Sequence, residues 1–167
     1  KVYPLHERYL LLKERFPQYL IFDSVFDEWL CEVPVEAVKH HYEPVDYLRT
    51  LRQKKELTEL EKAALNFAEL LKKNANIPWN MLGISGSLLV GLHTPQSDID
   101  IIVYGSQNCY KVYDSLRALI YDENSPVKSY SREELRRLFD FRSKDTSMPF
   151  EDFVRTESRK VLQGRFK

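Results

Sequence analysis

Apolar side chains follow helical spacing most clearly over residues 58–73. Within this range they stand three or four positions apart, and they therefore share one face of a helix. The residues of this face are Leu60, Ala64, Phe67 and Leu71. Thr58 and Glu61 precede them with the spacing of a capping box. The pattern predicts a helix that starts at Thr58 and turns this face toward a core.

Shorter stretches indicate further helices, and prolines indicate where several of them begin or end. One predicted helix carries Tyr9, Leu12 and Phe16 and breaks at Pro17, and a short one begins at Pro44. Another spans residues 108–122, with Val112, Leu116 and Leu119 inward. The last two run from a second capping box at Ser131 and Glu134 to about Phe141, and from Pro149 as first residue to near Gly164. The rest of residues 1–43 is rich in aromatic side chains and predicts short helices and turns. We therefore expect a largely helical N-terminal region.

Two strand-like runs lie in the middle of the chain, on either side of a glycine–serine pair. The first is "WNMLGIS", residues 79–85, and the second is "SDIDIIVYG", residues 97–105. Residues 81–85 and 98–104 are predicted to be neighbouring strands, and "PVKSY" predicts a further short strand. The order helix, strand, turn, strand, helix predicts an α+β fold with a small sheet.

The overall composition narrows the function classes. The chain has 167 residues, a net charge of zero, and two cysteines, Cys31 and Cys109. The length fits about one domain, and the balanced charge gives no global attraction to nucleic acid or to a membrane. No apolar run approaches the length of a membrane helix, and two cysteines provide no disulfide framework. We therefore expect a cytoplasmic protein that does not associate with membranes.

Positive charge is concentrated near the end of the chain. Residues 126–167 carry eleven basic side chains against seven acidic ones. Arg155, Arg159 and Lys160 fall on one predicted helix and could contact the phosphates of an acceptor. A solvated helix face, with these cations paired to Glu151 and Glu157, explains the same charges equally well.

Asp98 and Asp100 are the first candidates for chemistry. Residues two apart on a strand point to the same face, so the two carboxylates would project together while Ile99, Ile101 and Val103 face a core. Two parallel acids repel each other unless a cation lies between them. Mg²⁺ prefers oxygen ligands of this kind and usually binds together with phosphates.

Gly86 and Ser87 are the second candidates. Glycine allows the backbone to approach a ligand closely, and Ser87 could cap the short helix "SLLVGL". A turn from a strand into a helix directs free N–H groups at an anion. The turn and the neighbouring strand therefore predict a pocket for a magnesium-bound nucleoside triphosphate.

The stretch "GSLLVGLHTPQSDIDIIV" resembles the nucleotidyltransferase signature of the DNA polymerase beta-like superfamily, which includes the minimal nucleotidyltransferases. The whole chain is similar to uncharacterised archaeal proteins described as predicted nucleotidyltransferases. The resemblance implies a small mixed sheet flanked by helices. It also implies that Gly86 and Ser87 bind the triphosphate, and that Asp98 and Asp100 bind two Mg²⁺ ions as catalytic and metal-binding residues. Two such ions would clamp the attacking and leaving oxygens of an in-line displacement.

The chain departs from the family pattern in two ways. Many minimal members carry an arginine where Val90 stands. The family's third carboxylate is not evident downstream, where Asp140 in "FDF" is a weak candidate and a strand beyond Lys167 is the alternative. We therefore expect residues 1–56 to form a helical, aromatic-rich N-terminal region, and residues 57–167 to form a nucleotidyltransferase-like domain that is incomplete at its C-terminus.

Two functions remain open from the sequence. The first is a magnesium-dependent enzyme that moves a nucleoside monophosphate from a nucleoside triphosphate such as ATP to a hydroxyl acceptor. That acceptor could be a nucleic acid, a protein or a small molecule. The second is a non-catalytic nucleotide-binding or scaffold module that keeps the fold, and the missing third carboxylate supports it.

Overall fold

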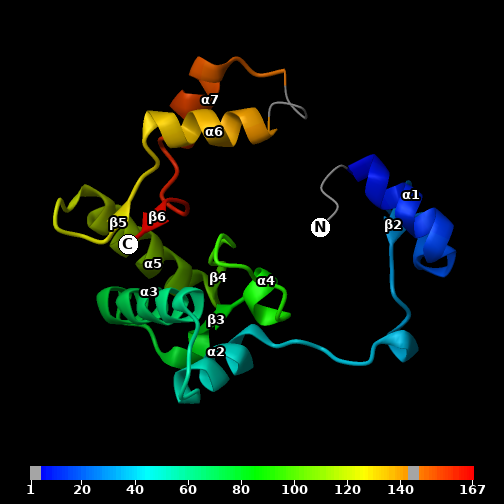
Figure 1. Cartoon of the computed structure of the whole chain (residues 1–167), viewed down its shortest axis with the longest axis horizontal. Helices are drawn as coiled ribbons and strands as arrows, with labels where there is room; N and C mark the ends of the chain where they lie inside the picture. Colours follow the sequence, from blue (N-terminus) through cyan, green and yellow to red (C-terminus); the bar gives the residue numbers. More distant parts are fainter. Residues whose placement is uncertain (1–4, 143–146) are drawn as a thin grey trace. The chain divides into compact units, whose positions relative to one another are not determined.

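A computed structural model describes residues 5–142 and 147–167 of the chain. The chain divides into two compact units, Lys1–His41 and Tyr42–Lys167. Figure 1 labels the helices and strands of each unit. In the described part of the chain, no helix combines the length and the apolar character needed to span a bilayer.

The first unit consists of a helix and a β-hairpin. Its elements are α1 (Leu5–Arg15), a short 3-10 helix (Pro17–Tyr19), β1 (Leu20–Asp23), β2 (Glu28–Cys31) and a second 3-10 helix (Val35–Ala37). The break after α1 at Pro17 confirms the prediction, whereas the antiparallel hairpin of β1 and β2 was not predicted. Phe22 packs edge-on against Trp29 across the hairpin, and the hydroxyl of Tyr9 on α1 donates to the carbonyl of Trp29 at 2.6 Å.

The second unit contains the other helices and strands. Its elements are α2 (Pro44–Gln53), α3 (Glu59–Ala75), a 3-10 helix (Trp79–Met81), β3 (Leu82–Ile84), α4 (Gly86–Leu89), β4 (Ile101–Val103), α5 (Ser106–Tyr121), β5 (Val127–Lys128), α6 (Arg132–Arg142), α7 (Phe150–Glu157) and β6 (Arg165–Phe166). These elements confirm the α+β class. Within the described residues the strands form separate antiparallel pairs, β1 with β2, β3 with β4 and β5 with β6, and not the expected mixed sheet.

The pair β3 and β4 lies where the sequence predicted neighbouring strands. Gly83 stands opposite Ile102 in the register. Backbone hydrogen bonds extend the ladder on both sides, from Ser85 N to the carbonyl of Asp100 at 2.8 Å and from Tyr104 N to the carbonyl of Met81 at 2.9 Å. The paired strand is shorter than predicted, because β4 begins at Ile101 and the residues from 98 to 100 lead into it.

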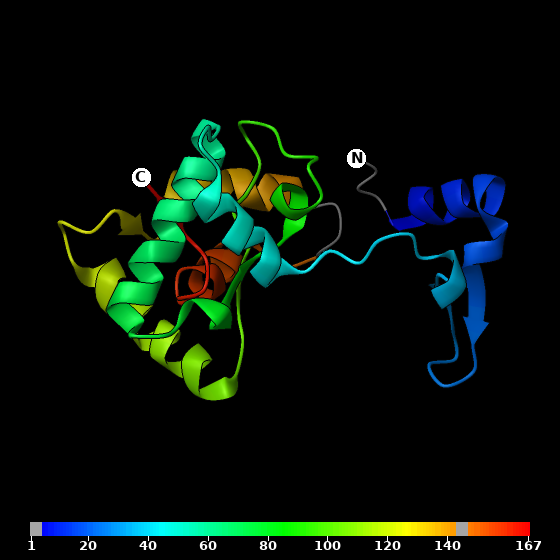
Figure 2. The same cartoon turned by 90° about the horizontal axis from the view of Figure 1, so that it is seen from below.

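Helix α3 packs on α5 and β3, and Figures 1 and 2 show α3 beside α5. The predicted capping box of Thr58 and Glu61 is present in both directions. Of the predicted apolar face, Ala64 and Leu71 are fully buried, while Leu60 and Phe67 pack at the edge of the core. Ala68 is also completely buried, because its small side chain lets the helix approach its neighbours closely.

Two further helix predictions need comment. The second capping box, of Ser131 and Glu134, is present at the start of α6. Pro149 precedes the first residue of α7 as its N-cap, and the helix ends at Glu157 and not near Gly164. The helix stops early because the chain turns back after Glu157 and brings Val161 and Phe166 onto the core.

Candidate functional site

A cavity of about 870 Å³ lies between α3, β4, α5 and the segment that carries β6. This volume is within the range of small-molecule and cofactor sites. The polar and charged residues of its wall include Ser97, Asp98, Asp100, Tyr130, Arg142, Gln163, Arg165 and Lys167. Most of the remaining wall is apolar, so the cavity offers a few charged groups against a largely apolar surface.

Asp98 and Asp100 both line this cavity. Ile99, Ile101 and Val103 are partly buried against the core, as predicted, but they line the same cavity, so the two faces are not cleanly separated. Both aspartates are exposed, and within residues 5–142 and 147–167 no ion pair or hydrogen bond engages either carboxylate. Two exposed carboxylates without a positive partner form an acidic edge that favours a hard cation.

Gly86 brings the glycine–serine turn directly against Asp100. Its φ of +63° lies in the left-handed region, and a Cβ at this position would stand 2.0 Å from Oδ2 of Asp100. Glycine suits this backbone conformation, and any other side chain here would have to displace the carboxylate of Asp100. The structure therefore brings together two parts of the predicted site that are separated by more than ten residues in the sequence.

Ser87 lies beside this contact but does not cap the helix as predicted. Helix α4 begins at Gly86, so Ser85 takes the N-cap position and makes no side-chain capping bond. The prediction for Ser87 as a cap was wrong because the helix starts two residues earlier than a cap at Ser87 requires. The backbone carbonyl of Ser87 accepts a hydrogen bond from Leu92 N at 2.9 Å, which folds the following loop back onto α4.

The loop before Asp98 is closed by short hydrogen bonds. Thr94 N donates to Oγ of Ser97 at 2.9 Å, and Ser97 N donates to the carbonyl of Thr94 at 3.0 Å. This turn carries the chain from α4 back toward β4. It delivers Asp98 to the edge of the cavity next to the turn at Gly86.

Among the residues of the cavity wall that sequence reasoning missed are Tyr130 and Arg142. Burial and the negative charge of Asp98 raise the pKa of Tyr130, while the positive charge of Arg142 acts in the opposite direction. The phenol is therefore within electrostatic range of both charges. No motif marks these two residues, because they follow β5 and end α6, and only the folded chain places them near Asp98.

The third carboxylate that the sequence left open is not found in the cavity wall. Among the described residues, the acids that line the cavity are Asp98 and Asp100, and Asp140 on α6 is not one of them. The same residues contain no cluster of three or more His, Cys, Asp or Glu side chains that could hold a metal ion.

The cations of α7 and of the segment after it are mainly engaged in ion pairs. Arg155 pairs with Asp152, and Lys160 pairs with Glu157 at 2.6 Å. The pair of Lys160 with Glu157 agrees with the expected pairing, whereas Glu151 pairs with Arg132 on α6.

A family model described as "Nucleotidyltransferase domain" matches residues 66–162. The chain is also similar to the uncharacterised protein MJ1086 of Methanocaldococcus jannaschii, with 31% identity over 156 residues. The matched region covers 93% of this chain and 45% of that relative, so the chain spans less than half of the relative's length. No solved structure matches the chain significantly.

Proposed function

Since the chain belongs to the nucleotidyltransferase domain family, we propose that it transfers a nucleoside monophosphate from a nucleoside triphosphate to a hydroxyl acceptor, with Mg²⁺ as the metal. The observation that supports this proposal best is the contact of Gly86 with the unpaired carboxylate of Asp100 at the cavity edge. The family supports nucleotidyl transfer in general. The donor, the metal and the residues that bind them are part of the proposal.

The side chains at the cavity edge fit a magnesium site. Asp98 and Asp100 offer hard carboxylate oxygens, and neither is engaged by another described side chain. Asp100 occupies the space that a side chain at position 86 would fill. When bound, Mg²⁺ would neutralise the charge that develops on the phosphate oxygens during transfer.

Residues around the two aspartates bind and orient the nucleotide. In the proposal, the backbone of Gly86 and the hydroxyl of Ser87 donate to the phosphates, and Asp98 and Asp100 hold the metal. The largely apolar wall of the cavity accommodates the less polar part of the nucleotide and excludes water from it. With these roles, the reacting phosphate lies near the carboxylates of Asp98 and Asp100.

The reaction joins the acceptor oxygen to the α-phosphorus, and the bond from this phosphorus to pyrophosphate breaks. The acceptor hydroxyl must also lose its proton, and a positioned base typically accelerates such a step by about 10²–10⁴-fold. Among the described residues, the cavity wall contains no acid besides Asp98 and Asp100. This observation favours a second candidate function, a nucleotide-binding module that binds the triphosphate without transferring it.

Incubation with labelled nucleoside triphosphates, Mg²⁺ and a cell extract as the acceptor pool separates the two functions. For the enzyme we expect labelled product that is lost in Asp98→Asn. Labelling that is also lost in Asp140→Asn would give the third carboxylate role to Asp140. Binding of Mg²⁺ and ATP without any labelled product would support the non-catalytic module.

A further inference from the structure

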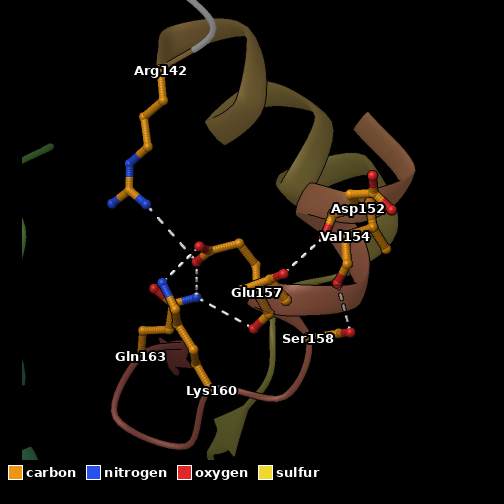
Figure 3. A network of polar contacts seen from close by, with 8 residues as sticks. Arg142, Asp152, Val154, Glu157, Ser158, Lys160 and Gln163 are labelled. Carbon is orange, nitrogen blue, oxygen red and sulfur yellow. Dashed lines mark hydrogen bonds and ion pairs between the residues drawn. The ribbon is translucent and has the colours of Figure 1, made fainter. Parts of the chain in front are cut away.

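Arg142 extends a cation into the cavity from the C-terminal end of α6. Its side chain is about half exposed, at 47%, and it lines the same cavity as Asp98 and Asp100. Figure 3 shows the side chain reaching from the helix toward the carboxylate of Glu157. The guanidinium is therefore accessible to a ligand in the cavity.

Glu157 pairs only loosely with Arg142, because closer partners already occupy its carboxylate. Nζ of Lys160 donates to Oε1 of Glu157 at 2.6 Å, and Nε2 of Gln163 donates to Oε2 at 2.6 Å. Nη1 of Arg142 is 3.8 Å from Oε2, which is beyond hydrogen-bond distance. Figure 3 shows this arrangement, with Lys160 and Gln163 nearest the carboxylate.

The ionisation of Glu157 agrees with this arrangement. Burial alone would raise the pKa of its carboxyl group. Hydrogen bonds from Lys160 and Gln163, together with the positive charges of Lys160 and Arg142, lower the pKa below its usual value. Glu157 is therefore an anion that Lys160 and Gln163 already engage by direct hydrogen bonds, while Arg142 stands further away at 3.8 Å.

Other arginines near Arg142 are held by direct acidic partners. Arg132 pairs with Glu151 and Arg137 pairs with Glu133 on the exposed side of α6. Arg165 also lines the cavity, but its Nε is 3.1 Å from Oε1 of Glu134. Lys167 lines the cavity as well.

Tyr130 lines the same cavity as Asp98 and Arg142, and its phenol lies within electrostatic range of both charges.

We propose that Arg142 binds a phosphate group of the donor nucleotide, leaving its loose pairing with Glu157 to do so. This inference rests on the proposed function and assigns a further substrate-binding residue to the same site. A guanidinium makes two parallel hydrogen bonds to a phosphate, and such charge-assisted bonds are among the strongest that side chains form. The donor is the favoured source of the phosphate because Arg142 lines the same cavity as Asp98 and Asp100, where the proposal places the metal-bound triphosphate.

Calorimetry with ATP and with adenosine, both in the presence of Mg²⁺, tests the assignment. Arg142→Gln should weaken ATP binding by about 10- to 100-fold, the range expected for a charge-assisted hydrogen bond, and should leave adenosine binding unchanged. Arg142→Lys should recover part of the ATP affinity, since it restores the charge without the two-pronged geometry. Arg137→Gln is the matched control from the same helix, and it should bind ATP like the wild type.

Four results would overturn the assignment. Unchanged ATP affinity in Arg142→Gln, while Asp100→Asn loses affinity, would reject Arg142 and keep the proposed function. An equal loss for ATP and adenosine in Arg142→Gln would show that the residue does not act through a phosphate. An effect confined to the KM for the acceptor would place the phosphate on the acceptor. Absence of ATP binding by the wild type would reject the proposed function together with the assignment.

Discussion

Replacing Gly86 with alanine should displace the carboxylate of Asp100 and leave most of the fold intact. The new Cβ would stand 2.0 Å from Oδ2 of Asp100, and the carboxylate must move by about 1 Å to reach even 3.0 Å. Mg²⁺ requires its oxygen ligands at about 2.0–2.1 Å in nearly ideal geometry. We therefore expect the affinity for Mg²⁺ with ATP to fall by about tenfold or more, comparable to the loss of one charged ligand.

Gly91→Ala is the matched control for this experiment. Gly91 has a φ of +69°, close to the +63° of Gly86, but a Cβ there would meet nothing within 4 Å. Both variants place alanine in the left-handed region and should each lose about 1–2 kcal/mol of unfolding free energy. Only Gly86→Ala also moves a carboxylate.

The assay is calorimetric titration of Mg²⁺ with ATP into both variants and the wild type, together with urea unfolding of each protein. We expect similar unfolding free energies for the two variants and weakened ligand binding in Gly86→Ala alone. Equal ATP affinity in Gly86→Ala and Gly91→Ala would refute the role assigned to the contact between Gly86 and Asp100.

Two further predictions concern stability. Gly83→Ala should lower the free energy of unfolding by about 1–3 kcal/mol, because the added Cβ would lie 2.6 Å from Cβ of Pro44 at the start of α2. Urea titration measures this loss, and an unchanged midpoint would contradict the close packing of α2 on β3. Burial alone would raise the pKa of Glu61, but hydrogen bonds from Lys54 and Thr58 lower it below the usual 4.5. The ionised carboxylate therefore stabilises the fold at pH values above 4.5. This stabilisation is lost as the pH falls through the lowered pKa of the folded state. Glu61→Gln should cost about 1 kcal/mol at pH 7 and progressively less in acid, and a cost that does not change with pH would contradict the ionic role of Glu61.

The parts of the fold that could be predicted from the sequence are those fixed by local contacts. The capping box of Thr58 and Glu61 and the apolar spacing behind it determine α3 within a single stretch of chain. The hairpin of β1 and β2 could not be predicted in this way. Its strands have four residues each, and Asp27 takes the left-handed position of its turn where glycine would have given a stronger signal.

The candidate site likewise contains residues that the sequence predicted and residues that it did not. Asp98, Asp100, Gly86 and Ser87 belong to one continuous motif, so the sequence predicted that they meet. The structure brings Gly86 against Asp100 and places both aspartates in the cavity wall, whereas Gly86 and Ser87 are not among the described residues of that wall. Tyr130 and Arg142 come from segments far from this motif, after β5 and at the end of α6, where β5 packs on α5 and α6 packs on α7. No periodicity or spacing connects them to Asp98, and only the folded chain reveals them.

The central claim, that the two aspartates at the cavity edge hold a metal-bound nucleotide, is tested most directly by the affinity of Asp100→Asn for Mg²⁺ with ATP. Asp114→Asn is the matched control, because Asp114 is exposed on α5 and does not line the cavity. We predict that calorimetry will give Asp114→Asn the wild-type affinity and Asp100→Asn an affinity at least about tenfold lower, as the loss of a charged oxygen ligand requires. Equal affinities for the wild type and both variants would contradict the claim.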